Sequence, residues 1–256
     1  DLFKKIINRG EDAGKVERMY VCAGLGKLKG SEAIELLAKA LNQKDPNVRG
    51  SAVKALSDIG TPEVNQYIIQ ALRDSHVIPR LTAVQAAGEL EIIDAIPYLE
   101  YQFKQDPEKK VKEQAVIALG KIGTETCAEI LKKNITDEKI PDVYRALLFS
   151  VYIENFGTKL EKNSPVLEFF IKAMNDKTRT LFTEITRKIF ASTSPNFVPF
   201  IALLLEDKDF TVRLNALAWL ERNKIKDLLD KIKQISESDP VETVRKKAQT
   251  VYESQR

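Results

Sequence analysis

A basic side chain recurs along the chain at nearly constant intervals, and this periodicity constrains the fold more than any other feature. Successive basic positions lie 31 to 34 residues apart: Arg18, Arg49, Arg80, Lys112, Arg145, Arg179, Arg213 and Arg245. Self-similarity at a period of roughly 20 to 50 residues is typical of repeat proteins, in which each copy is one supersecondary unit. The sequence therefore predicts about eight structural repeats.

Each copy contains two amphipathic helices. Residues three, four and seven positions after the basic residue are mostly apolar or small, as in Ala52, Val53 and Leu56 after Arg49. These offsets share one face of an α-helix, so the helix that carries the basic residue has a buried stripe. A second amphipathic segment precedes it, most clearly at residues 33–41, 64–72, 166–174 and 198–205. We call the segment that comes first the first helix and the one with the basic residue the second helix.

The residues between the helices are typical of helix ends. Acidic residues, in part followed by proline, precede several second helices: Asp45, Asp106, Asp176 and Asp209. Aspartate caps a helix by accepting hydrogen bonds from free backbone N–H groups, and proline suits the first turn. Gly60, Gly123 and Gly157 are predicted to adopt the left-handed conformation that often ends a helix. No alternating strand pattern occurs, and we expect an all-α fold.

One helix pair of this size cannot bury its apolar stripe alone, so the pairs must stack. The product is an α-solenoid with a concave and a convex face. We expect residues 1–256 to form a single solenoid domain taken from a longer chain, with an inserted surface loop over 156–165.

Composition excludes several classes of function. Forty Lys and Arg against 37 Asp and Glu leave a net charge of +3, too balanced to indicate a nucleic-acid partner. His76 is the only histidine, and Cys22 and Cys127 are the only cysteines. A four-cysteine zinc site, a disulfide framework and most histidine-dependent catalysis are therefore excluded. We expect no cofactor and no enzymatic activity.

The chain contains no apolar run of about 18 residues, so we expect no membrane span. Because the sequence starts at Asp1 rather than Met, a removed leader is one explanation. A cytoplasmic location is favoured, with an exported or periplasmic location as the alternative, and the oligomeric state stays open.

The pattern Asp-Pro-x-Val-Arg-x-x-Ala-Val-x-Ala-Leu-x-x-Ile-Gly, matched by residues 45–60, resembles HEAT repeats. The short period is most similar to the HEAT modules of phycobilin lyases, and the resemblance covers nearly the whole chain. It implies a right-handed α–α superhelix of the HEAT/armadillo type with about eight helix pairs. It does not fix a function, because one scaffold serves many.

The resemblance also implies a structural role for the basic column. In HEAT repeats the arginine and the aspartate before it pair between adjacent copies as a ladder. The matching positions here are Asp45, Arg49, Arg80, Arg145, Arg179, Asp209, Arg213 and Arg245. An arginine stripe that captures phosphate is the alternative interpretation of the same column.

The second helix lines the concave face in this family, so its outward side chains are candidate partner contacts. Positions one, two, five and nine after the basic residue should be exposed there, and they carry mixed charges and recurring apolar residues. We predict apolar anchors at Leu81, Ile117, Leu147, Leu181 and Leu214, and rim contacts at Tyr20, Lys54, Glu184 and Arg222. The alternative is that these leucines pack against neighbouring repeats as core residues.

A non-catalytic scaffold that binds a protein or peptide segment on its concave face is the function we expect. Nucleic-acid binding is the first alternative, but the only tryptophan, Trp219, lies in a column of core residues rather than on a stacking platform. A lyase or enzyme-accessory module is the second alternative and comes from the resemblance alone. Cys22 shares a core column with Val53, and Cys127 has no histidine partner, so neither predicts a nucleophile.

Overall fold

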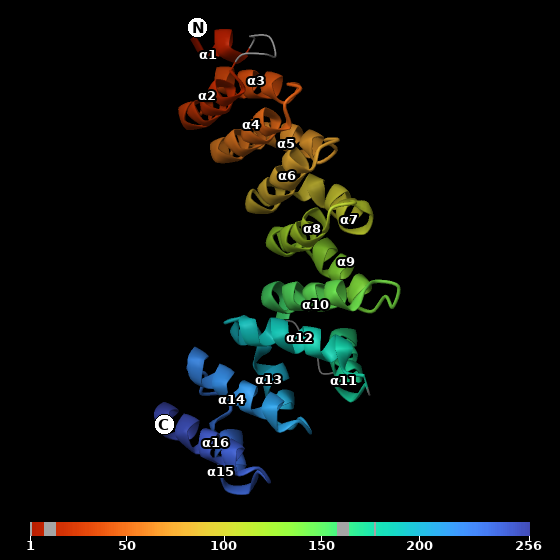
Figure 1. Cartoon of the computed structure of the whole chain (residues 1–256), viewed down its shortest axis with the longest axis vertical. Coiled ribbons are helices and arrows are strands. Elements are labelled where there is room, and N and C mark those ends of the chain that lie inside the picture. Colours follow the sequence, from red (N-terminus) through yellow and green to blue (C-terminus); the bar gives the residue numbers. More distant parts are fainter. Residues whose placement is uncertain (1, 8–13, 158–163, 177) are drawn as a thin grey trace. The chain divides into compact units, whose positions relative to one another are not determined.

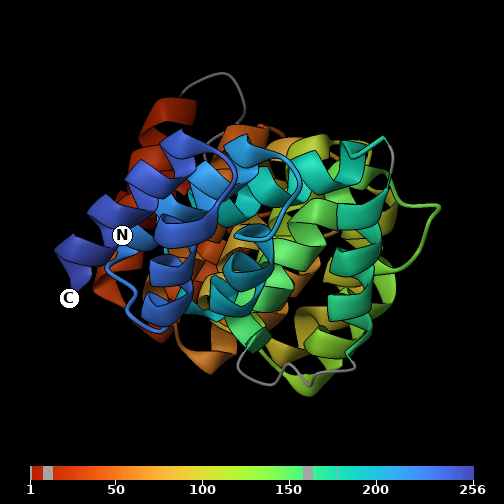
Figure 2. The same cartoon turned by 90° about the horizontal axis from the view of Figure 1, so that it is seen from below.

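The computed structural model describes residues 2–7, 14–157, 164–176 and 178–256, and the elements in these ranges are helices without a strand (Figures 1 and 2). The predicted loop at 156–165 lies largely outside the described residues. Three short 3-10 helices, η1 (Pro62–Val64), η2 (Ile93–Ala95) and η4 (Pro195–Phe197), lead directly into first helices. The all-α prediction is confirmed.

The α-helices alternate between first and second helices of successive pairs. After α1 (Leu2–Ile7), the first helices are α3 (Ser31–Ala40), α5 (Asn65–Ala71), α7 (Ile96–Gln105), α9 (Glu125–Ile135), α11 (Pro165–Asn175), α13 (Val198–Leu204) and α15 (Leu229–Ser238). The second helices are α2 (Lys15–Leu28), α4 (Pro46–Ile59), α6 (Val77–Glu89), α8 (Lys109–Ile122), α10 (Asp142–Phe156), α12 (Thr180–Ala191), α14 (Phe210–Asn223) and α16 (Glu242–Gln255).

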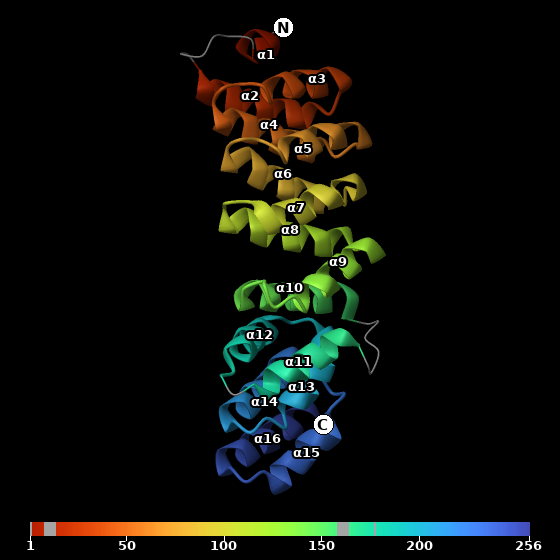
Figure 3. The ribbon, with the colours of Figure 1, turned by 90° about the vertical axis from the view of Figure 1, so that its right-hand side faces the viewer.

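The chain divides into two compact units, residues 1–131 and 132–256. In the first unit, α2, α4, α6 and α8 pack side by side in chain order, and each of α4, α6 and α8 also contacts the first helix of its own pair (Figure 3). In the second unit, α10, α12, α14 and α16 pack in the same succession. The expectation of one domain over 1–256 stays a prediction.

The buried stripe of the second helices is confirmed. The column three residues after the basic position is buried in every copy: Val21, Ala52, Ala83, Ala115, Leu148, Phe182, Ala216 and Ala248. Thr183 and Gln249, polar members of the next column, are exposed instead. Burial of a valine, leucine or phenylalanine side chain contributes about 1.5–3 kcal/mol and an alanine methyl group about 0.8 kcal/mol, so the stripe stabilises every repeat.

Glycines let adjacent second helices approach closely in the first unit. A Cβ on Gly26 of α2 would lie 3.1 Å from the Cα of Ala55 on α4. A Cβ on Gly88 of α6 would lie only 2.8 Å from the Cα of Ala118 on α8. Both helix–helix contacts therefore depend on the missing side chain.

The helix ends follow the sequence in most places. Asp45 and Asp209 cap α4 and α14 by accepting from the backbone N–H of Asn47 and Thr211, at 2.8 and 2.9 Å. Gly60 and Gly123 have φ of 70° and 68°, in the left-handed region.

The prediction for Gly157 was wrong, because its φ is −59° and its conformation is right-handed. Glycine is needed there for a different reason, since a Cβ would lie 2.9 Å from the Cβ of Asn196. The Asn196 amide donates to the carbonyls of Ile153 and Glu154 at the end of α10, at 3.1 and 3.0 Å. A side chain from a later repeat thus adds hydrogen bonds at the C-terminal end of α10, where Ile153 also accepts the backbone N–H of Gly157.

Candidate functional site

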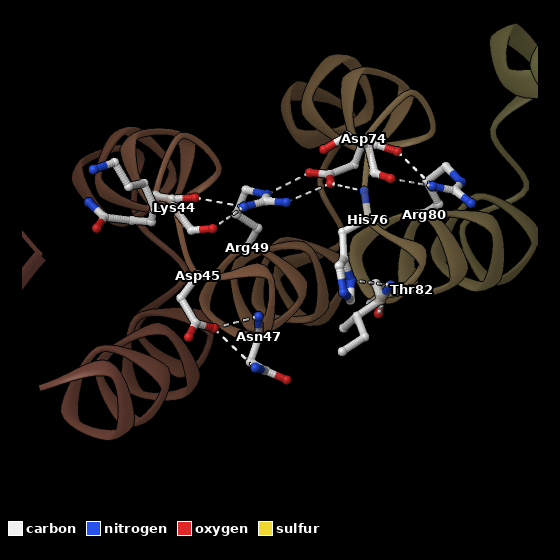
Figure 4. A network of polar contacts seen from close by, with 11 residues as sticks. Lys44, Asp45, Asn47, Arg49, Asp74, His76, Arg80 and Thr82 are labelled. Atoms are coloured by element: carbon white, nitrogen blue, oxygen red, sulfur yellow. Dashed lines mark hydrogen bonds and ion pairs between the residues drawn. The ribbon is translucent and has the colours of Figure 1, made fainter. Parts of the chain in front are cut away.

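Four arginines of the basic column form ion pairs with the following repeat. Arg49 binds Asp74 through Nε and Nη2, both at 2.7 Å (Figure 4). Arg80 makes the same two contacts with Asp106, at 2.8 and 3.1 Å. In the second unit, Arg213 binds Asp239 at 2.8 and 2.9 Å. The fourth pair is single, from Arg179 Nη2 to the Asp207 carboxylate at 2.7 Å.

The remaining guanidinium nitrogen ties the pair to its own turn. Nη1 of Arg49 donates to the carbonyls of Gln43 and Lys44, at 2.9 and 2.7 Å (Figure 4). Nη1 of Arg80 donates in the same way to Asp74 and Ser75. Nη1 of Arg213 donates to Asp207 and Lys208. We call each arginine–aspartate contact between repeats a rung, and these three rungs each join two consecutive turns.

The acidic partners are not the ones that the resemblance implied. Each lies six residues before the basic residue of its own repeat and accepts a backbone N–H two residues on, as Asp74 does from His76 at 2.8 Å. Asp45 and Asp209 make no pair with the arginine column among the described contacts, because their carboxylates face the helix N-termini that they cap. Asp45 does lie 3.9 Å from Lys15 of the preceding repeat.

The ladder does not form in the same way in every repeat. Gln43 stands in place of the aspartate in the repeat after Arg18 and accepts from Arg18 Nη1 at 3.2 Å, so this contact has no carboxylate. Asp176 ends α11 with the same extended backbone that Asp106 has at the end of α7, and it accepts the Thr178 N–H. Its position in the sequence differs, because Ala173 is the residue six positions before Arg179.

Two arginines assigned to the ladder make other contacts. Arg145 binds within its own repeat, to the carbonyl of Ile135 at 3.0 Å and to Asp142 at 3.3 Å. Nη1 of Arg245 donates to the carbonyl of Asp239 at 2.6 Å, the contact that the other arginines make with their own turn. Arg245 has no carboxylate partner in the described part of the chain.

The paired arginines are poorly placed to bind phosphate. The Arg80 and Arg213 side chains are 10% and 9% exposed, and their Nε and Nη2 groups already hold carboxylates. Breaking such a pair leaves an uncompensated buried charge, which costs several kcal/mol. The phosphate-binding interpretation therefore loses four of the eight basic residues on which it depends.

The acid dependence of stability should report on these rungs. Burial acts to raise the pKa of the Asp74 carboxyl, but hydrogen bonds from Arg49 and the His76 N–H, with the Arg49 charge, lower it below the ordinary value of 3.8. The pKa of Asp239 is lowered in the same way against its burial, chiefly by Arg213. A lowered folded pKa contributes stability that is complete above the unfolded value and is lost as pH falls through the folded value.

We therefore expect the free energy of unfolding to fall steeply below about pH 4, and Asp74→Asn to flatten part of that decline. Urea unfolding at pH 7, 5, 4 and 3, followed by far-UV circular dichroism, measures both curves. Parallel acid limbs for the wild type and the variant would contradict this assignment.

In the first unit, two of the predicted partner contacts line a shared groove. This helix-face groove crosses α4, α6 and α8, has a volume of about 260 Å³, and is lined by Lys54, Gln85, Glu89, Gln114, Ile117 and Lys121 among others. Leu81 is half-buried on α6, and Tyr20 on α2 is 75% exposed. Lys54 pairs with Asp58 at 3.0 Å, so charges of both signs surround the groove.

In the second unit, the prediction for Leu147 was wrong because this side chain is only 8% exposed. All residues from 146 to 153 are buried, since α10 packs against both α12 and η4 and keeps no exposed stripe at this level. Leu181 and Leu214 are half-buried.

The two charged residues predicted in the second unit make local contacts. Glu184 pairs with Arg187 at 2.6 Å. Arg222 donates to the carbonyls of Phe190 and Ser192, at 2.7 and 3.1 Å, near the end of α12. Its guanidinium therefore has a structural contact in addition to any role at a surface.

A larger groove was not predicted from the sequence. This turn groove, of about 970 Å³, is lined by the turn between α5 and α6, by α7, and by the turn after α7. Its exposed lining includes Arg73, His76, Tyr101 and Glu108, and Tyr98 is half-buried. The signal that could have found it is the pair of tyrosines three residues apart on a first helix, next to Pro97.

The other residues that the sequence analysis considered for stacking or catalysis are buried or make structural contacts. Trp219 is 2% exposed, in core phase as predicted, and its Nε1 donates to the Ser192 carbonyl at 2.7 Å. Cys22 and Cys127 are free and fully buried, and burial raises the pKa of the Cys22 thiol to about 12. His76 caps α6 through Nδ1, which accepts from the Ile78 N–H at 3.2 Å. Within the described residues, no three His, Cys, Asp or Glu side chains are grouped to hold a metal, and no helix is long and apolar enough to cross a bilayer.

A family profile described as "Spirochaete HEAT repeat protein" matches residues 2–251. The chain belongs to this family. Its helix pairs and stacked second helices are those of a HEAT-repeat solenoid, and the resemblance stated from the sequence is confirmed. No curated protein sequence matches the chain.

Solved structures similar to this HEAT-repeat protein include enzymes and designed proteins. Human deoxyhypusine hydroxylase in complex with glycerol is 15% identical, with a TM-score of 0.43, and the match covers 100% of this chain and 95% of that chain. The complex of CpcE and CpcF of phycocyanin lyase from Nostoc sp. PCC7120 is 18% identical, with a TM-score of 0.48 and coverage of 100% and 94%. A designed armadillo repeat protein is 16% identical, with a TM-score of 0.34 and coverage of 100% and 99%.

Proposed function

We propose that this HEAT-repeat protein is a non-catalytic scaffold that binds a protein segment on the outward face of its second helices. The helix-face groove is the observation that carries this proposal. Residues from three consecutive second helices line it, so a bound segment would contact several repeats at once. A contact of this kind uses the rigid stacking of repeats, which is how solenoids present extended binding surfaces.

The chemistry of the groove favours a polypeptide over a polyanion. Lys54 and Lys121 are opposed by Asp58 and Glu89, so no single sign of charge dominates, whereas nucleic acid needs a basic groove. The half-buried Ile117 supplies an apolar contact, and the amides of Gln85 and Gln114 supply hydrogen-bonding groups. The proposed occupant is a protein segment with an apolar anchor residue between charges of both signs.

The proposal keeps the predicted contacts that reach the surface. In the first unit they are Tyr20, Lys54, Leu81 and Ile117, and in the second unit they are Leu181, Glu184, Leu214 and Arg222. Leu147 is withdrawn because it is buried.

Two matched double variants test this function. Lys54→Glu with Ile117→Ala alters the helix-face groove, and Lys39→Glu with Ile34→Ala makes the same changes on α3, where one side chain is also exposed and the other half-buried. Proteins captured from the source lysate by wild type are identified by mass spectrometry, and their affinities for all three chains are measured by biolayer interferometry.

We expect the groove variant to weaken binding about tenfold or more and the α3 variant to leave it unchanged, because a few central contacts dominate an interface. Equal affinities for the two variants would remove the groove from the interface. Recovery of nucleic acid alone, lost as salt is raised, would overturn the proposal in favour of phosphate binding.

A further inference from the structure

The turn groove has features of a binding site that the scaffold function above does not use. Its volume of about 970 Å³ lies within the range of roughly 300–1,000 Å³ typical of ligand sites. A smaller groove of about 440 Å³ lies one repeat earlier, over the Arg49–Asp74 rung, and is lined by Asn42, Gln43 and Gln70 without an aromatic residue. The site at α7 is therefore larger than its neighbour and is the one with aromatic walls.

Two tyrosines and two prolines give this groove a ridged apolar surface. Tyr98 and Tyr101 lie three residues apart on α7 and therefore share a side of the helix. Tyr101 is 64% exposed, and Pro97 and Pro107 are exposed beside the tyrosines. Flat rings separated by exposed prolines are suited to pack against other rings or against pyrrolidines.

The polar groups of the groove are mainly hydrogen-bond donors. The Arg73 guanidinium lies over the Tyr98 ring, 4.7 Å from its centroid, and within the described residues it makes no hydrogen bond or ion pair. Because His76 Nδ1 accepts the Ile78 N–H, the proton of the neutral imidazole is on Nε2, which is then a donor. The Gln105 amide and the hydroxyls of the tyrosines and Ser75 can donate as well as accept.

The buried polar side chains of the groove already have hydrogen-bond partners. Asp106, on the groove floor, is held by Arg80 and by the Glu108 N–H. Gln102 is buried, and its amide donates to the Leu72 carbonyl. Glu108 is the exposed carboxylate that remains. A ligand with carbonyl acceptors for Arg73 and His76 and compact apolar rings for the tyrosines therefore complements this groove.

We propose that the turn groove binds a proline-rich protein segment in the polyproline II conformation. Proline has no backbone N–H, so such a segment presents carbonyl acceptors and pyrrolidine rings, which complement the donors and the tyrosines of this groove. The ordered conformation of the free segment also reduces the entropy lost on binding, as in other aromatic-lined grooves that take such ligands. The turn groove is formed by the turn between α5 and α6, the start of α6, helix α7 and the turn after α7. It shares no lining residue with the helix-face groove.

Fluorescence anisotropy with three labelled ten-residue peptides tests the proposal on the full chain. One peptide is decaproline, one alternates Gly and Ser, and one alternates Glu and Gly. We expect decaproline alone to bind, and Tyr101→Ala to weaken it about tenfold or more, because exposed tyrosines are frequent hot spots. Phe210→Ala removes an exposed aromatic ring from the start of α14, outside both grooves, and should leave binding unchanged.

Binding of the acidic peptide in place of decaproline would overturn the proposal and assign the groove to anionic ligands of Arg73. Absence of decaproline binding, or equal binding by Tyr101→Ala with an unchanged circular dichroism spectrum, would also overturn it. The proposed function survives each of these outcomes, because it depends on Lys54 and Ile117 and has its own variants.

Discussion

Arg80→Ala is expected to lower the free energy of unfolding by about 3–5 kcal/mol, as measured for other buried ion pairs that lose one partner. The Asp106 side chain is 2% exposed and would keep its charge without the two guanidinium contacts that now offset its burial. The carbonyls of Asp74 and Ser75 would lose their donor in the same variant. Urea unfolding at pH 7, analysed by linear extrapolation, measures the change.

Two further variants show how much of this loss in the free energy of unfolding comes from leaving a buried charge without its partner. Lys109→Ala breaks an exposed pair with Glu113, 3.6 Å away, and should cost less than about 1 kcal/mol. Arg80→Met with Asp106→Asn removes both charges and keeps an acceptor for the Glu108 N–H, and should recover part of the loss. A cost for Arg80→Ala as small as that for Lys109→Ala would show that the rung contributes little.

Gly88→Ala is expected to destabilise the chain by about 1–3 kcal/mol, even though alanine is the better helix former. The new Cβ would lie 2.8 Å from the Cα and 2.9 Å from the Cβ of Ala118, so α6 and α8 must separate. Separation would loosen the buried columns that both helices contribute to the core. Thermal and urea unfolding measure the loss.

Gly30→Ala is the matched control for this change. Gly30 is exposed, has φ of −110°, and a Cβ there would meet nothing within 4 Å. Because Gly30 is the N-cap of α3, where alanine is less favourable than glycine, we expect a loss of at most about 1 kcal/mol, less than for Gly88→Ala. If the two alanine variants were equally stable, the close approach at Gly88 would not limit the packing.

The sequence predicted what depends on local periodicity. A spacing of three, four and seven residues places side chains on one helix face whatever the neighbours are, so the buried columns followed from the repeat alone. Trp219 was placed in the core by the same argument. Leu147 was misplaced because its exposure depends on how α10 is covered by α12 and η4, and no spacing within one repeat contains that information.

Contacts between repeats were harder to predict because they depend on the offset between stacked pairs. Arg49 reaches the turn of the next repeat, and the partner there is Asp74 rather than the capping Asp45. An acidic residue six positions before the basic one was visible in the sequence at Asp74, Asp106, Asp207 and Asp239, yet only the stacking shows which arginine binds it. The turn groove depends on the same offset, which brings the 72–77 turn next to Tyr98 and Tyr101.

The division of the ladder into two runs of rungs has a consequence for how the repeats unfold. Repeat proteins behave approximately as one-dimensional lattices in which each unit is coupled only to its nearest neighbours. In the described part of the chain the rungs fall in two runs, one from Arg49 to Asp106 in the first unit and one from Arg179 to Asp239 in the second unit. A fluctuation that opens the repeats of one run therefore breaks no rung of the other run. The rungs make unfolding cooperative within each run of repeats.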